Sequence, residues 1–130
     1  MRALAREVAF KKIYSSLFIL KEDDLQNFFE IDNLIEDPDK EFANILVDLY
    51  IQNKQDVDSL INGYLVDFSP ERIFRIDRAI ISLATVELVY YKETPVSVVI
   101  NEAVKLAKKF GSEKSYSFVN GILKSISKGI

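Results

Sequence analysis

The chain has 130 residues, 48% of them hydrophobic, with nine Phe and six Tyr, which is enough for one domain with a hydrophobic core and argues against disorder. It contains no Cys and no His, which excludes a disulfide framework, a thiolate metal site and the commonest catalytic base. The net charge of −3 is unevenly distributed, because residues 1–21 carry +4, residues 22–71 carry −12 and residues 72–130 carry +5.

Hydrophobic residues at helical spacing predict an all-α fold of about seven helices, with no β-strand of useful length. The first half of the chain is predicted to form helices over residues 3–20, about 25–31, 38–53 and 57–68. Asp37 followed by Pro38 is typical of a helix start, since an acceptor side chain caps the helix and proline fits its first turn. Ser69 and Pro70 repeat this pattern, which predicts that a central buried helix begins there, and Thr94 and Pro95 are predicted to end it.

The last two helices are predicted over residues 96–110 and about 113–127. Gly111 is placed to end the first of them in a left-handed conformation, and Ser112 is placed to cap the second. Gly121 interrupts the hydrophobic pattern of the final helix, where glycine costs about 1 kcal/mol relative to alanine. We expect that Gly121 lets another backbone approach closely, and that Asn120 needs hydrogen-bond partners if it is buried.

Basic residues gather at both ends of the chain. Arg2 and Arg6 lie four residues apart on one side of the first helix, near its N-terminus, where cations oppose the helix dipole. An anionic partner would account for them, and so would mobile surface charge at a frayed end. Lys105, Lys108 and Lys109 suit the C-terminal end of their helix. If the two ends meet in space they form a positive patch; otherwise they are solvated faces with no shared target.

The sequence contains no phosphate-binding glycine loop, no dinucleotide fingerprint and no metal-ligand spacing. The remaining carboxylates, lysines and tyrosines show no convincing catalytic arrangement, so we expect a helical binding module without a cofactor rather than an enzyme. Glu87 lies within the central hydrophobic helix and must therefore be paired or face a partner. No hydrophobic run approaches the length of a membrane span and no signal peptide is evident, so a cytoplasmic protein without membrane contact is expected.

Residues 118–123, Phe-Val-Asn-Gly-Ile-Leu, preceded by Gly-Ser-Glu-Lys-Ser at 111–115, resemble the terminal-helix signature of the NusB family of bacterial transcription antitermination factors. Residues 101–111, 77–88 and 5–14 are similar to the preceding, central and first helices of that family. The resemblance covers most of the chain and is weakest over residues 21–56. It implies a single RNA-binding domain, residues 1–130, made of two small packed bundles of about residues 1–66 and 67–130.

The resemblance also implies a function. The family binds the boxA segment of nascent RNA together with ribosomal protein ten of the small subunit (NusE), and the pair helps RNA polymerase resist termination, notably in ribosomal RNA operons. The expected partners are therefore boxA-type single-stranded RNA, NusE and, indirectly, the transcribing polymerase complex, with the chain a monomer or homodimer. The family's RNA surface maps onto Arg2, Arg6, Tyr14, Tyr64, Lys114 and Phe118. Its ribosomal-protein surface maps onto Asp77, Arg78 and Glu87.

Alternatives remain open at this point. The sparse arginines and acidic middle also suit a helical protein-interaction module without a direct RNA role, and related helical domains precede the catalytic domain in some RNA methyltransferases. Tyr14 and Phe118 would stack on RNA bases if exposed, but core packing explains them equally well. If Arg6 contacts RNA, Arg6→Ala is predicted to weaken RNA binding and leave the fold intact.

Overall fold

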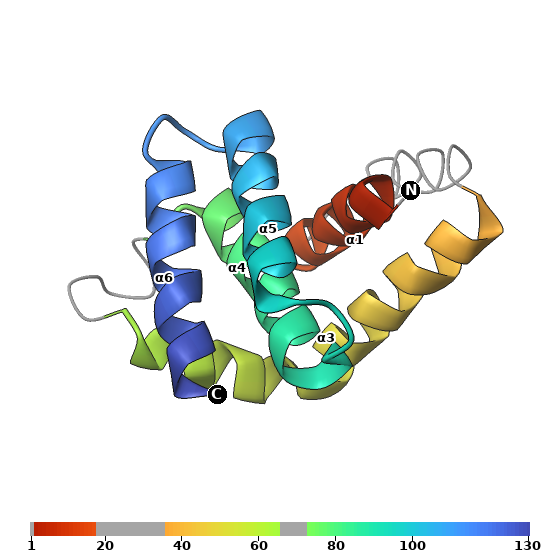
Figure 1. Ribbon diagram of the computed structural model, residues 1–130, viewed down its shortest axis with the longest axis horizontal. Helices are drawn as coiled ribbons and strands as arrows, with labels where there is room; N and C mark the ends of the chain where they lie inside the picture. Colours follow the sequence, from red (N-terminus) through yellow and green to blue (C-terminus); the bar gives the residue numbers. More distant parts are fainter. Residues whose placement is uncertain (1, 18–35, 66–72) are drawn as a thin grey trace.

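The computed structural model describes residues 2–17, 36–65 and 73–130, and all regular elements in these ranges are helical (Figure 1). They are α1 (Arg2–Ser16), α3 (Asp37–Gly63), α4 (Arg75–Val86), the π-helical turn η2 (Glu87–Tyr91), α5 (Val96–Phe110) and α6 (Ser115–Gly129). The all-α prediction is confirmed. The number differs from the predicted seven, because the described ranges hold five α-helices and η2, and the helix predicted near residues 25–31 lies outside them.

The two helices predicted over residues 38–53 and 57–68 are one helix, α3, as far as the structure describes it. Figure 1 shows α3 changing direction part-way along, and the backbone of Asn53 is non-helical there (φ −119°, ψ 16°). The side-chain amide of Asn53 donates to the carbonyl oxygen of Leu49 at 2.8 Å, a local bond of the kind that competes with regular helix geometry. Pro38 lies in the first turn, as predicted, but the residue before the helix is Glu36 rather than Asp37.

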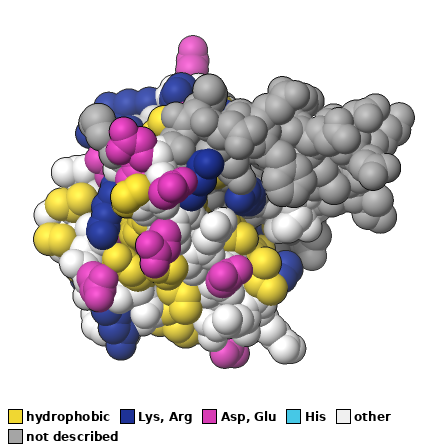
Figure 2. Space-filling view, turned by 90° about the vertical axis from the view of Figure 1, so that its right-hand side faces the viewer, with side chains coloured by type: hydrophobic (Ala, Val, Ile, Leu, Met, Phe, Trp, Pro, Cys, Tyr) yellow, Lys and Arg dark blue, Asp and Glu magenta, His cyan; other side chains and the backbone are white. Residues whose placement is uncertain are grey.

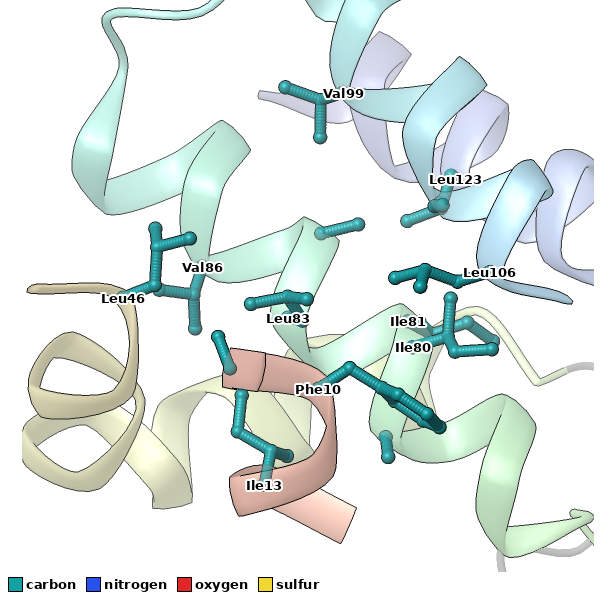
Figure 3. Close-up of a cluster of buried hydrophobic side chains, with 14 of the residues drawn as sticks. Phe10, Ile13, Leu46, Ile80, Ile81, Leu83, Val86, Val99, Leu106 and Leu123 are labelled. Carbon is teal, nitrogen blue, oxygen red and sulfur yellow. The ribbon is translucent and has the colours of Figure 1, made fainter. Parts of the chain in front are cut away.

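Helix α4 lies at the centre of the fold and packs against α1, α3, α5 and α6 (Figures 1 and 3). It is buried on nearly all sides because residues 79–88 carry almost only small or hydrophobic side chains. Figure 3 shows the core that results, built by α1, α3, α4, α5 and α6 from residues that include Phe10, Ile13, Leu46, Ile80, Ile81, Leu83, Val86, Val99, Leu106 and Leu123. The prediction of a central buried helix is confirmed, although its described start is Arg75 and the predicted start at Ser69 and Pro70 lies outside the described residues.

The corner between α5 and α6 corrects two predictions. Gly111 is extended (φ −89°, ψ −171°), so it does not end α5 in a left-handed conformation. Glycine is needed there for a different reason, since an added Cβ would lie 2.5 Å from the Cβ of Ser115 and 2.7 Å from the carbonyl oxygen of Ala107. Ser112 does not cap α6 through its side chain, since the residue before the helix is Lys114 and no side chain caps it. The backbone N–H of Ser112 donates to the Ser115 hydroxyl at 2.8 Å, and the two hydroxyl oxygens lie 3.1 Å apart.

The prediction that Gly121 permits close backbone packing is wrong. Gly121 is exposed, and a Cβ added there would meet nothing within 4 Å apart from its own helix and chain neighbours. Two residues of an α-helix rotate by about 200°, so Gly121 faces almost directly away from the buried Val119. The closely packed glycine of α6 is instead Gly129, where an added Cβ would collide with the phenol of Tyr64.

Candidate nucleic-acid interface

Arg6 forms a buried ion pair with Glu87 that ties α1 to η2. Its Nε donates to Glu87 Oε1 at 2.8 Å and its Nη2 to Oε2 at 2.7 Å, and the two side chains are only 7% and 1% exposed. Burial alone lowers the pKa of the Arg6 guanidinium, but the hydrogen bonds and charge of Glu87 outweigh it and raise that pKa. Glu87 is therefore paired inside the chain, and the same burial disfavours the prediction that Arg6 meets RNA directly.

Arg2 lies one helical turn before Arg6 and is exposed. Its guanidinium carbon lies 4.4 Å from the ring centroid of the buried Phe42 and 5.9 Å from that of Tyr91. Arg6 approaches the same Phe42 ring at 5.2 Å, and the Phe42 and Tyr91 rings meet edge to face at 5.3 Å. Cation–π contacts of this kind orient a guanidinium without neutralising it, so Arg2 is held at the surface with its charge available.

The other predicted RNA-binding residues are spread along α1, α3 and α6. Lys114 is exposed directly before α6, while Tyr14 and Phe118 are half-buried against the core. Tyr64 packs against Gly129 at the far end of α6 from Lys114, about 21 Å away along a helix of 15 residues. Lys114 and Phe118 thus share one end of α6, and Tyr64 lies at the other.

The residues predicted to bind the ribosomal protein all make contacts within the chain. Asp77 is 6% exposed, and burial raises the pKa of its carboxyl group, an effect that the Ser115 hydroxyl partly offsets. Arg78 donates from Nη2 to Asn62 Oδ1 at 3.0 Å and to Asp58 Oδ1 at 3.5 Å, which ties α4 to α3. Together with the pairing of Glu87, these contacts give Asp77 and Arg78 roles in packing helices, so direct docking through them stays a prediction.

The two basic ends of the chain meet at a place that the sequence did not predict. Glu7 and Lys11 of α1 and Lys109 and Phe110 of α5 form a group that we call the Phe110 cluster. Glu7 accepts from Lys109 Nζ at 2.6 Å and from Lys11 Nζ at 3.4 Å. The Lys11 and Lys109 ammonium groups lie 5.3 and 5.4 Å from the centroid of the Phe110 ring. The lysines near residue 109 were visible in the sequence. The helix dipole alone was enough to explain them, so they did not indicate a contact with α1.

The surface that Figure 2 shows mixes charges of both signs. Acidic and basic side chains alternate there around a patch of hydrophobic side chains, and no single sign dominates the described part of this face. The separation of charge along the sequence therefore does not become one uniformly positive face in this view. A nucleic-acid strand would be held by a few placed cations rather than by a broad field.

The described residues offer neither a membrane span nor a metal site. None of the helices in residues 2–17, 36–65 and 73–130 is both long and apolar enough to cross a membrane. Within the same ranges, no three side chains from His, Cys, Asp and Glu gather so that they could hold a metal ion.

Comparison with known proteins places the chain in a family. The family model described as NusB family matches residues 3–128. The transcription antitermination protein NusB of Syntrophotalea carbinolica is 38% identical over 144 residues, covering 98% of this chain and 92% of that protein. The structure of T. maritima NusB is similar with a TM-score of 0.87 at 37% identity, covering 98% of this chain and 91% of that one. A crystal structure of the antitermination factors NusB and NusE in complex with dsRNA is similar with a TM-score of 0.86 at 29% identity, covering 99% of this chain and 97% of that one. The chain belongs to the NusB family.

Proposed function

We propose that this chain is a transcription antitermination factor that binds boxA-type RNA together with ribosomal protein ten of the small subunit (NusE). The observation that carries the proposal is the match of nearly the whole chain to the solved NusB–NusE–RNA complex. The family membership and the name of the relatives support the same role. The chain acts by binding rather than catalysis, in the cytoplasm, and reaches RNA polymerase through the assembly on the nascent transcript.

The geometry supports a limited RNA surface on this chain. Arg2 presents an oriented charge, and Lys114 presents a second at the start of α6. Tyr14 and Phe118 each leave part of the side chain accessible, which suits stacking against unpaired bases. Arg6 contributes indirectly by fixing α1, because its own guanidinium is occupied by Glu87. Arg2 and Lys114 are the exposed cations among the predicted RNA-binding residues, and two cations imply few phosphate contacts, so we expect RNA affinity to depend strongly on NusE.

The test is a titration of labelled boxA RNA with this chain, with and without NusE, over a series of salt concentrations. A scrambled strand of equal length serves as the matched competitor. The proposal expects tighter binding of single-stranded boxA RNA than of the scrambled strand, and a clear gain in affinity when NusE is added. Equal affinity for the two RNAs with NusE present would overturn it.

A second candidate function is a protein-interaction module without a direct RNA role. The observation that favours it is that Arg6, one of the predicted RNA-binding cations, is occupied by Glu87 within the chain. This function predicts that NusE binds the chain with unchanged affinity in the presence and absence of RNA. Ultraviolet crosslinking in the ternary mixture would then label NusE and leave this chain unlabelled.

A further inference from the structure

We propose that the Phe110 cluster binds phosphate groups of the RNA backbone through Lys11 and Lys109, so that the strand has an anchor where α1 meets the end of α5. The proposal rests on the proposed RNA-binding function and names a further contact surface for the same ligand.

The charge balance of the cluster favours an anion. Two ammonium groups share the one carboxylate of Glu7, which leaves a net charge of +1. Burial tends to raise the pKa of Glu7, but Lys109 and Lys11 outweigh it and lower that pKa, so Glu7 is ionised at neutral pH. A phosphate oxygen near the two ammonium groups would supply the missing negative charge.

The donors of the cluster are positioned and accessible. An ammonium group has three N–H donors, and one bond to Glu7 leaves others for a ligand. The Lys109 side chain is 62% exposed in spite of its short ion pair, and the Lys11 side chain is 23% exposed. The Phe110 ring lies beside both ammonium groups. It packs on Phe10 at a centroid distance of 5.2 Å, which holds the Phe110 ring in place. The two lysines therefore need little rearrangement to meet a phosphate.

The cluster also lies close along the chain to another predicted RNA contact. Lys109 is the next-to-last residue of α5, and Lys114 lies directly before α6. Near the same end of α5, Lys108 lies 5.4 Å from the ring centroid of Tyr116, which is 48% exposed.

A purely structural role makes a different prediction. The lysines near the end of α5 also complement the helix dipole, and Glu7 with Lys109 links two helices. These roles affect the stability of the fold and have no effect on the salt dependence of RNA binding. The two accounts are therefore separated by an RNA titration with a stability measurement beside it.

The experiment compares the native chain with Lys11→Gln, Lys109→Gln and the double variant, each with NusE, in titrations of single-stranded boxA RNA over a salt series. Lys54→Gln is the matched control, because Lys54 also pairs with a carboxylate, that of Asp58 at 3.0 Å, but lies in the acidic part of the chain. Each lost phosphate contact should make the slope of log affinity against log salt shallower by about 0.7. Between about 50 and 200 mM salt, the affinity of the native chain should thus fall about 7-fold further than that of the double variant.

The proposal is supported if the double variant shows this shallower slope while Lys54→Gln and the melting temperatures stay as in the native chain. It is overturned if the native chain binds boxA RNA and the double variant binds with the same affinity and slope. If the variants melt at a lower temperature than the native chain, the deciding measurement is acetylation of lysines in the native chain. BoxA RNA must then protect Lys109, and not Lys54, from acetylation. A native chain that binds no RNA even with NusE would overturn the proposed function first, and this proposal with it.

Discussion

The buried pair of Arg6 and Glu87 allows a sharp prediction about stability. Arg6→Met removes the guanidinium and keeps much of its volume, so Glu87 stays in the core without its charge partner. The Glu87 side chain is 1% exposed, and both of its oxygens accept from Arg6. Breaking such a pair from one side costs about 3–5 kcal/mol, because a buried charge is left uncompensated.

This loss is large beside the total stability of a small domain, which is about 5–15 kcal/mol. For a chain of this length it corresponds to a fall in melting temperature of roughly 10–20 °C. The double variant Arg6→Met with Glu87→Leu removes both charges and should recover most of the loss, since well-packed hydrophobic residues replace buried ion pairs at little cost. By the same reasoning, Arg6→Ala is expected to destabilise the fold, in place of the sequence-based expectation that it leaves the fold intact.

The assay is urea unfolding followed by helical circular dichroism, with thermal melting as a second measurement. Arg2→Met is the matched control, because Arg2 lies on the same helix and over the same Phe42 ring but is exposed. It should cost no more than about 1 kcal/mol, the contribution of an exposed cation–π contact. An Arg6→Met variant within about 0.5 kcal/mol of the native chain, or a double variant no more stable than the single one, would refute the reasoning.

Three further predictions concern other parts of the chain. Arg2→Ala should weaken boxA RNA binding and make its salt slope shallower by about 0.7, measured by titration with NusE; an unchanged slope would remove Arg2 from the interface. Gly121→Ala should stabilise the fold by about 1 kcal/mol in urea unfolding, because a Cβ there meets open space, whereas Gly111→Ala should destabilise it through collision with Ser115; equal effects would contradict this contrast. Burial raises the pKa of Asp77, so the folded state holds its proton more tightly than the unfolded state. Its destabilising effect is therefore absent at pH values below the ordinary carboxyl pKa and grows as pH rises through the raised pKa. Asp77→Asn should accordingly gain stability relative to the native chain between pH 4 and pH 7, and parallel stability curves for the two proteins would rule this out.

Much of the helical architecture is readable from the spacing of hydrophobic residues. The helix predicted over residues 96–110 is observed as α5 with the same bounds, and the final helix is displaced by only two residues. The central position of α4 follows because a helix that is hydrophobic on most sides has to be covered on most sides. The kink of α3 was not predicted, since Asn53 bends the helix through a local hydrogen bond without ending it.

The candidate site was less predictable because its pairings join distant residues. The requirement that Glu87 find a partner was visible in the sequence, but nothing local indicated that the partner is Arg6. The same holds for Glu7 and Lys109, which are 102 positions apart. Gly121 shows the opposite case, in which counting helical rotation from Val119 would have placed it on the outer face.

The distance along the chain between Arg6 and Glu87 has a consequence for biosynthesis. Arg6 leaves the ribosome 81 residues ahead of its partner. At about 5–20 residues per second, this corresponds to a delay of roughly 4–16 s. During that time α1 can form turns, but the carboxylate that fixes it in place has not yet been made. The first helix of the nascent polypeptide thus lacks this ion pair until Glu87 has emerged, and its arginine stays hydrated until then.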